Sequence, residues 1–212
     1  YKFDFGVTPV GKDSTTVVGG AFYNLQTSKN SAFRFTAERR AMTDSLLSYY
    51  GMVDNNSGTY WGGVTKNGGR IEFASDDGFF GYSLAGSYYQ YRGDNVKKNS
   101  SYGLSAVAYV HPFKPTAYED MTIGISLSYE NYDNNQNHFS FGHGGYFSPQ
   151  NYLIAAIPFT YKLRNDKYDI AVDASLGYQT YVNDEADFFP GHDDLNKLAQ
   201  TLNQSGLLKR AK

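Results

Sequence analysis

A histidine and a serine beside a glycine-rich stretch come nearest to a catalytic pattern in this sequence. His138 and Ser140 lie two residues apart, so they would share one face of a strand, and Asn151 follows downstream. Together they offer the groups of a nucleophilic triad. The polar run at 134–137 is typical of a loop, however, and a triad depends on fixed geometry. We therefore expect a protein that is not an enzyme.

Metal and cofactor chemistry has little support in the sequence. His138 and His143 are two histidines without a carboxylate partner, and such a pair seldom holds a metal. The chain contains no cysteine, which excludes a disulfide framework and a cysteine-based metal site. Asp76 and Asp77 stand next to Gly78 and are typical of a turn. The sequence predicts neither a metal site nor a bound cofactor.

Composition narrows the possible partners of this 212-residue chain. The formal net charge is −2 and no basic block is present, so nucleic acid is not expected as a partner. No apolar run approaches the roughly 18 residues of a transmembrane helix. Aromatic residues make up 17% of the chain, mostly tyrosine, which collects where an apolar zone meets water. We expect one domain, residues 1–212.

Alternation of apolar with small or polar residues is the main structural signal. In residues 121–129 and again in 169–181, one face is apolar and the other carries serine, glycine or single charged groups. Several segments approach the roughly 10 residues that a tilted strand needs to cross a bilayer. The pattern predicts about nine strands. The remaining seven are 33–38, 70–75, 79–91, 102–111 and 151–163, with weaker signals at 1–7 and 15–26.

The connections between these segments alternate in length. Short links rich in turn-forming residues fall at 26–30, 75–78, 113–120 and 164–167, and long ones near 39–69, 131–150 and 184–212. Leucines at helical spacing predict a short loop helix over 193–204, with Gly206 as its C′ residue. Short turns on one side and long loops on the other are typical of a bacterial outer-membrane protein. We predict an all-β, antiparallel, porin-like transmembrane β-barrel.

A soluble, carbohydrate-binding β-sandwich with one wet face is the alternative, since its strands alternate in the same way. The two folds differ in what covers the apolar faces. A sandwich turns them inward against a second sheet, whereas a barrel turns residues such as Ile123, Ile125, Val172 and Leu176 toward lipid.

Three motifs connect the sequence to a known family. "MTDSLLSYYG" (42–51), "WGGVTKNGGRIEF" (61–73) and "FGHGGYFSPQNY" (141–152) occur in this order. With the strands between them, they resemble the C-terminal barrel domain of the BcsC-type cellulose synthase proteins, the outer-membrane exporters of bacterial cellulose, over essentially the whole chain. The resemblance implies a 16-stranded channel in the outer membrane, in contact with lipid and with a cellulose chain. It also implies, in full-length proteins, periplasmic helical repeats that hold the cellulose synthase complex.

About nine strands are fewer than such a barrel needs, so we expect this chain to form an incomplete part of one. Unpaired backbone groups are costly in the hydrocarbon of a membrane, so further strands would have to pair with the two open edges of the sheet. The expected structure is a curved, open antiparallel sheet. Strands near 1–5 and 170–181 should each have one unpaired edge.

A neutral glucan offers hydroxyl groups and apolar C–H faces, so its channel needs aromatic rings and polar side chains. We expect residues 139–152 to fold over the extracellular mouth as a gate or guide, although such a loop can also pack only on itself. An exporter of another exopolysaccharide, such as a poly-aminosugar, would favour an acidic lumen. The expected pore-lining or mouth residues are Trp61, Glu130, Phe141, Tyr146, Phe147 and Asp173, and the expected loop hinge is Gly142, Gly144 and Gly145.

Overall fold

The alternating segments form long antiparallel strands in this computed structural model, which describes residues 1–9, 15–55 and 57–204. Within that part of the chain there are ten strands and two short helices. In chain order they are β1 (Lys2–Thr8), β2 (Thr16–Gln26), β3 (Ser31–Ala41), α1 (Leu46–Tyr50), β4 (Met52–Val53), β5 (Tyr60–Asp76), β6 (Phe80–Asp94), β7 (Asn99–Val110), β8 (Glu119–Tyr132), β9 (Gln150–Arg164), β10 (Asp169–Val182) and α2 (Asp193–Gln204).

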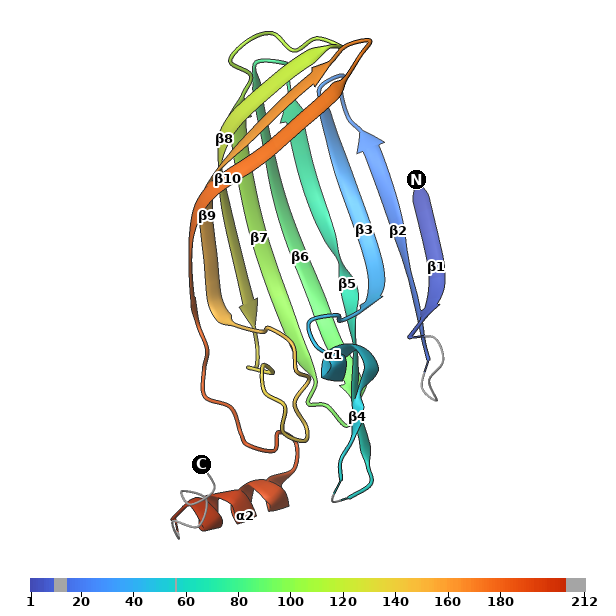
Figure 1. The fold of residues 1–212 in the computed structure, drawn as a ribbon, viewed down its shortest axis with the longest axis vertical. Helices are drawn as coiled ribbons and strands as arrows, with labels where there is room; N and C mark the ends of the chain where they lie inside the picture. Colours follow the sequence, from blue (N-terminus) through green and yellow to red (C-terminus); the bar gives the residue numbers. More distant parts are fainter. Residues whose placement is uncertain (10–14, 56, 205–212) are drawn as a thin grey trace.

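Each long strand pairs with the next long strand in the sequence, and the short β4 pairs with the start of β5. The result is one curved sheet that begins at β1 and ends at β10 (Figure 1). Within the described residues β1 pairs only with β2, and β10 only with β9. The predicted open antiparallel sheet with these two strands at its edges is confirmed.

The connections are sorted by length between the two ends of the sheet. The short turns after β2, β5, β7 and β9 lie at one end, at the top of Figure 1. The opposite end carries α1, β4, the connection 133–149, the segment after β10 and α2. This arrangement places most of the loop residues together on one side.

The first long connection is shorter than the expected 39–69, because β3 continues to Ala41 and β5 already begins at Tyr60. The glycine-rich part of the motif at 61–73 belongs to β5. Gly62 and Gly63 have φ values of +104° and +60°, and a register shift lies between Gly62 and Thr65. A β-bulge at these glycines lets the strand bend without ending.

The two faces of the sheet are chemically opposite. Apolar side chains of adjacent strands meet in register on one face, which we call the outer face; Ile125 pairs with Ala108, and Leu176 with Ile157. Ile125 is 67% exposed and Leu176 is 77% exposed. A soluble sandwich would cover this face with a second sheet, but the described residues form one sheet and leave it open. We call the opposite face, which carries Ser126 and Ser175, the inner face.

The two helices both belong to the loop-rich end. The bounds predicted for α2 are confirmed, and Gly206 lies outside the described residues. The five-residue α1 was not expected; Ser45 caps it by accepting a hydrogen bond from the Ser48 amide, while the Ser48 hydroxyl accepts one from the Ser45 amide. Neither helix in the described ranges has the length and apolar character needed to cross a membrane.

Candidate functional site

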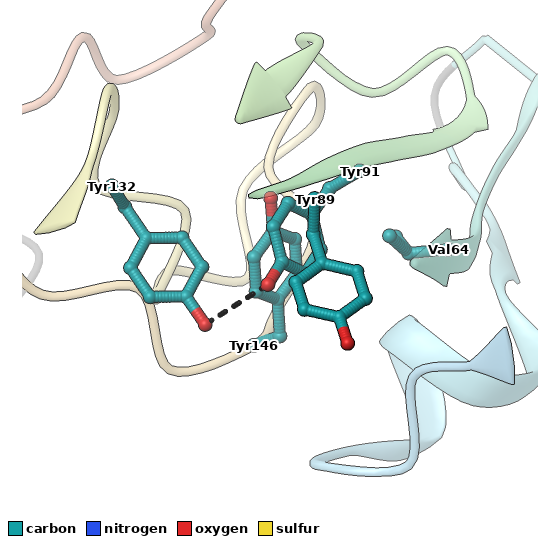
Figure 2. Close-up of a cluster of buried hydrophobic side chains, with 5 residues drawn as sticks. All are labelled: Val64, Tyr89, Tyr91, Tyr132 and Tyr146. Atoms are coloured by element: carbon teal, nitrogen blue, oxygen red, sulfur yellow. Dashed lines mark hydrogen bonds between the residues drawn. The ribbon is translucent and has the colours of Figure 1, made fainter. Parts of the chain in front are cut away.

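A cluster of buried side chains lies on the inner face at the loop-rich end (Figure 2). Tyr91 of β6 stacks on Tyr146 of the connection 133–149, with ring centroids 5.2 Å apart, and lies 5.2 Å from the ring of Tyr132 of β8. The Tyr91 hydroxyl donates a hydrogen bond of 3.2 Å to Tyr132 Oη. Val64 and Tyr89 complete this buried tyrosine cluster. It fixes the connection 133–149 onto the strands.

Hydrogen bonds inside the connection 133–149 hold it in one shape. The Gln136 amide donates to Ser148 Oγ at 2.6 Å, and the Gln136 side chain accepts from the Gly144 amide at 3.0 Å. Asn99 of β7 donates to the Asn134 carbonyl at 2.8 Å and to Tyr146 Oη at 3.1 Å. The connection is therefore a packed structure that rests on the inner face.

The same connection joins the neighbouring loops, and we call residues 133–149 together with 42–51, 95–98 and 183–192 the loop cap. Its bonds run to each of these three segments. They are Ser45 Oγ to the Gly145 carbonyl (2.6 Å), the Phe147 amide to Asp44 Oδ2 (3.0 Å), the Lys97 amide to the Gly142 carbonyl (2.9 Å), Asn135 Nδ2 to the Asp184 carbonyl (2.8 Å) and Ser140 Oγ to the Phe188 carbonyl (2.6 Å).

The three glycines of the expected hinge lie where the loops make close contact. Gly142 has a φ of +98°, and a Cβ atom there would lie 2.3 Å from the Pro190 carbonyl oxygen. Gly145 has a φ of +64°, and at Gly144 a Cβ atom would lie 2.4 Å from the Tyr146 ring. A side chain at Gly142 or Gly145 would push against a neighbouring loop, and one at Gly144 would displace the Tyr146 ring. Their role as a hinge stays a prediction.

His143 is buried in the loop cap, at 1% exposure. Its Nε2 donates to the Asp187 carbonyl at 2.9 Å, and its Nδ1 has no partner within the described residues. Burial lowers the pKa of His143 to about 4, and the nearby His138 and Lys97 also disfavour its charged form. His143 is thus neutral at neutral pH. No group of three or more histidine, aspartate or glutamate side chains in the described ranges is arranged to hold a metal.

A second aromatic group lies next to the buried cluster but remains open. Phe147, Tyr152 of β9 and Tyr181 of β10 meet edge to face, with ring centroids 5.3 to 5.9 Å apart. Phe147 is 37% exposed and Tyr181 is 44% exposed. Tyr152 Oη donates to Gln179 at 2.8 Å. We call these three residues the exposed aromatic trio. Their rings can stack against the C–H face of a ligand.

The structure divides the expected pore residues between packing and open positions. Trp61 is buried and meets Phe141 edge to face at 5.5 Å, and Phe141 also contacts His192 within the loop cap. Tyr146 belongs to the buried tyrosine cluster and Phe147 to the exposed aromatic trio. These positions bring the aromatic residues to one end of the sheet.

Glu130 and Asp173 lie on the inner face as the alternation indicates. Glu130 accepts from Ser101 at 3.4 Å, and Asp173 accepts from Thr160 at 2.9 Å. Tyr152 and Tyr181 were missed by the sequence reasoning. The period-2 pattern that places Asp173 inside continues to Tyr181 and was the signal that could have found it.

The inner face of β1 to β5 carries paired charges. Arg40 of β3 binds Asp4 and Glu38, and Lys66 binds Glu38 at 3.1 Å while lying 4.2 Å from the centre of the Tyr89 ring. A second set joins Arg34, Glu72 and Arg70. We call this region the charge-paired wall. Because each cation has an acidic neighbour, the wall presents no single sign of charge.

The polar groups of the possible triad are engaged elsewhere. Ser140 Oγ donates to the Phe188 carbonyl, and the side chain of Asn151 accepts from Tyr129 Oη at 2.9 Å. The His138 ring lies edge to face with His143, with centroids 5.0 Å apart. The structure does not bring His138, Ser140 and Asn151 together.

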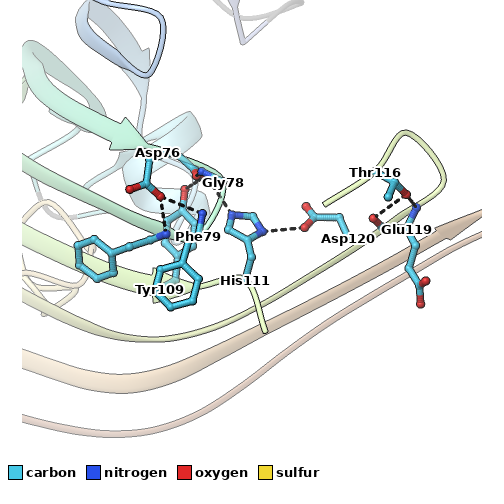
Figure 3. A network of polar contacts seen from close by, with 10 residues as sticks. Asp76, Gly78, Phe79, Tyr109, His111, Thr116, Glu119 and Asp120 are labelled. Atoms are coloured by element: carbon cyan, nitrogen blue, oxygen red, sulfur yellow. Dashed lines mark hydrogen bonds and ion pairs between the residues drawn. The ribbon is translucent and has the colours of Figure 1, made fainter. Parts of the chain in front are cut away.

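A polar cluster at the opposite end of the sheet holds the short turns (Figure 3). His111 follows β7 and contacts Asp76 of β5 at 3.2 Å and Asp120 of β8 at 2.8 Å. Burial opposes the charge of His111, but the two carboxylates outweigh this effect and raise its pKa. Tyr109 Oη also donates to Asp76, at 2.8 Å. These contacts join two neighbouring turns.

An open antiparallel sheet with an uncovered apolar outer face and a polar inner face has the architecture of a partial β-barrel. The chain belongs to the family described as "Cellulose synthase operon protein C C-terminus", whose model matches residues 1–211. The predicted resemblance is therefore confirmed.

Proteins named "Cellulose synthase operon protein C" are similar to this chain. The one from Pseudomonas fluorescens (strain SBW25) is 37% identical over 199 residues, which cover 92% of this chain and 15% of that protein. The one from Xanthomonas axonopodis pv. citri (strain 306) is 33% identical, with 94% and 13% covered, and one from Komagataeibacter xylinus is 34% identical, with 94% and 15% covered. The chain thus spans about 15% of the length of these relatives.

Proposed function

We propose that this chain forms part of the wall of an outer-membrane channel through which cellulose leaves the bacterial cell. The observation that carries the proposal is the contrast between the two faces of one open sheet. The outer face is uncovered and apolar, as lipid contact requires, and the inner face is polar with aromatic rings at one end. Membership of the cellulose synthase operon protein C family supports cellulose as the cargo.

The charges of the inner face favour a neutral cargo. A channel for a cationic poly-aminosugar would gain from an excess of acidic side chains. The charge-paired wall instead balances Arg40 and Lys66 against Asp4 and Glu38. A neutral glucan is held by rings and hydroxyl contacts at many shallow positions, and such binding permits movement along the channel.

The loop cap lies on the extracellular side in this proposal and acts as a gate or guide. The short turns, including the cluster around His111, then face the periplasm. In the full-length protein, periplasmic helical repeats on that side would hold the synthase complex. The channel acts by positioning and passage and carries out no reaction. Support for the loop cap's role comes from its placement on the inner face next to the exposed aromatic trio.

The membrane orientation can be tested with two adjacent residues of β8 in the natural full-length protein. Ile125→Arg places a charge on the outer face and should destabilise the inserted protein by about 2–4 kcal/mol near the bilayer midplane. Ser126→Arg places the same charge on the inner face and should be tolerated. Urea unfolding in lipid vesicles measures both effects. Equal destabilisation by the two variants would contradict the orientation.

The transport role is tested in cells that depend on the protein for cellulose. Cells without it should retain glucan in the periplasm, and the natural gene should restore cellulose outside the cell. Fractionation should recover the protein with the outer membrane. Normal cellulose export in its absence would overturn the proposed function.

A further inference from the structure

A groove crosses the inner face next to the loop cap, on the side toward the short turns, at the level of Gly103 in β7. Strand register sets five residues side by side there, since Arg70 pairs with Ser87, Ser87 with Gly103, Gly103 with Glu130 and Glu130 with Tyr152. The row therefore runs across β5, β6, β7, β8 and β9 in order. A cation stands near one end of the row, a carboxylate near the other, and the smallest residues lie between them.

The groove exists because its floor lacks side-chain bulk. Gly103 has no side chain, and a Cβ atom there would lie 2.7 Å from Ser87 Oγ. Ser105 and Ser128 pair with each other and continue the floor. The resulting hollow has a volume of about 440 Å³, with Arg70, Tyr89, Glu130 and Tyr152 among its walls. This volume falls within the about 300–1,000 Å³ of small-ligand sites.

The walls offer both kinds of hydrogen-bonding group. Arg70 is held in place because its Nη2 donates to Ser105 Oγ at 2.9 Å and to Glu72 at 3.3 Å. A guanidinium has five N–H donors, and both of these bonds use one nitrogen. Glu130 accepts a long hydrogen bond of 3.4 Å from Ser101 and also interacts with the Tyr132 hydroxyl. A carboxylate has further acceptor sites beyond these two contacts. The groove can therefore donate hydrogen bonds to a ligand and accept hydrogen bonds from it.

This combination matches a neutral polyhydroxyl ligand. Each hydroxyl of a sugar both donates and accepts, so it can use a guanidinium, a carboxylate and the serine hydroxyls of the floor. One cation and one carboxylate also leave the groove without net charge, which does not favour a phosphate or an ammonium group. Tyr152 belongs both to the groove and to the exposed aromatic trio. A chain bound in the groove can thus continue onto open rings.

We propose that this groove is a binding subsite for one pyranose unit of a neutral glucan chain on its way through the channel. The identity of the glucan rests on the proposed function, whereas the subsite itself rests on the registered row and its small floor. Several shallow contacts on one unit, followed by rings for the next, suit a polymer that must move.

The test uses two glycines of the same sheet in the natural full-length protein. Gly103→Val fills the floor of the groove, and valine suits a strand. Gly86→Val is the matched control, because Gly86 pairs with Leu104 on the outer face and a Cβ atom there would meet only Leu104, at 3.7 Å. Purified proteins are placed in planar lipid bilayers, and the block of single-channel current is measured with cellohexaose.

The expected result is a block by cellohexaose whose dissociation constant rises about tenfold or more in Gly103→Val. In Gly86→Val it should change by less than about twofold. Equal blocking of the wild-type protein and Gly103→Val would overturn the subsite, as would conducting wild-type channels that cellohexaose does not block. Stronger blocking by a chitosan hexamer than by cellohexaose would overturn its assignment to a neutral ligand.

Failure of the subsite and failure of the proposed function are distinguishable. Cellulose export in cells is measured for the same variants. If export continues normally but cellohexaose does not block the wild-type channel, the subsite is rejected and the proposed export function stands. If cellohexaose does not block the wild-type channel and cells lacking the whole protein also export cellulose normally, both the subsite and the proposed function are rejected.

Discussion

Two aromatic groups at the same end of the sheet differ in what surrounds them. The rings of the buried tyrosine cluster are packed, and its hydroxyls have partners, as between Tyr91 and Tyr132 and between Asn99 and Tyr146. The rings of the exposed aromatic trio touch one another but keep open faces. Tyr146 and Phe147 are consecutive residues and belong to different groups. One ring therefore holds the loop cap in position, and the next one is available to a ligand.

The comparison shows why aromatic content alone does not identify a binding surface. A buried tyrosine needs a hydrogen-bond partner, because an unsatisfied buried hydroxyl is costly. Ser101, Asn99 and Tyr132 supply those partners in the buried cluster. Phe147 has no hydroxyl, so it needs no hydrogen-bond partner and can remain half-exposed. Exposure and hydrogen bonding separate the two roles.

The largest expected effect is that of Tyr146→Ala. Removing this fully buried ring leaves a cavity and should lower the free energy of opening the loop cap by about 3–5 kcal/mol. Hydrogen exchange of the amides in 133–149 measures that energy in the natural protein in lipid or detergent. Phe147→Ala is the matched control and should change the exchange much less. Similar exchange in the two variants would contradict the distinction between the groups.

The pH dependence of the loop cap should follow His143. Its folded pKa of about 4 lies below the ordinary value of about 6.5, so the unfolded loop binds the proton more readily. The stabilisation is therefore complete above about pH 6.5 and is lost as the pH falls toward 4. Hydrogen exchange or protease cleavage within 133–149, compared at pH 7.5 and 4.5, measures this change.

His143→Gln is the control for that pH dependence. Glutamine can donate to the Asp187 carbonyl, as His143 does, but does not titrate. The variant should have a flatter pH profile between 7.5 and 4.5. The same slope in both proteins would show that another group controls the opening.

Local patterns predicted much of the fold. The alternation in residues 121–129 predicted the centre of β8, because each apolar residue reports one face of the strand. Leucines at helical spacing predicted α2. The five-residue α1 is too short to show a helical period, and only its Ser45 cap could have indicated it. The start of β5 was predicted to be loop because it contains Gly62 and Gly63. In the structure a β-bulge accommodates these glycines, so the strand continues through them.

The site was less accessible from the sequence because its contacts are long-range. Nothing local to Tyr146 shows that it stacks on Tyr91, a residue of β6. The same is true of Phe147, which meets Tyr181 of β10. Sequence alone placed Glu130 and Asp173 on the inner face, because alternation decides that. It did not separate buried rings from open ones.

A smaller effect is expected for Phe147→Ala on ligand binding. Loss of one open ring of the exposed aromatic trio removes a stacking surface and should weaken the block of channel current by cellohexaose about three- to tenfold. Phe147→Tyr keeps the ring and should retain the block. Tyr91→Phe, in the buried tyrosine cluster, is the comparison and should leave the block unchanged. A stronger effect in Tyr91→Phe than in Phe147→Ala would reverse the roles assigned to the two groups.

The smallest expected effect is that of Tyr152→Phe. The change removes the hydrogen bond from Tyr152 Oη to Gln179 but keeps the ring that meets Phe147 and Tyr181. Because this bond lies on an exposed surface, its loss should cost at most about 0.5–1 kcal/mol, and urea unfolding in lipid vesicles measures it. The block by cellohexaose should change by less than about threefold if stacking dominates. Tyr152→Ala removes the ring as well and should weaken the block further, so an equal loss in both variants would show that the hydroxyl, not the ring, carries the contact.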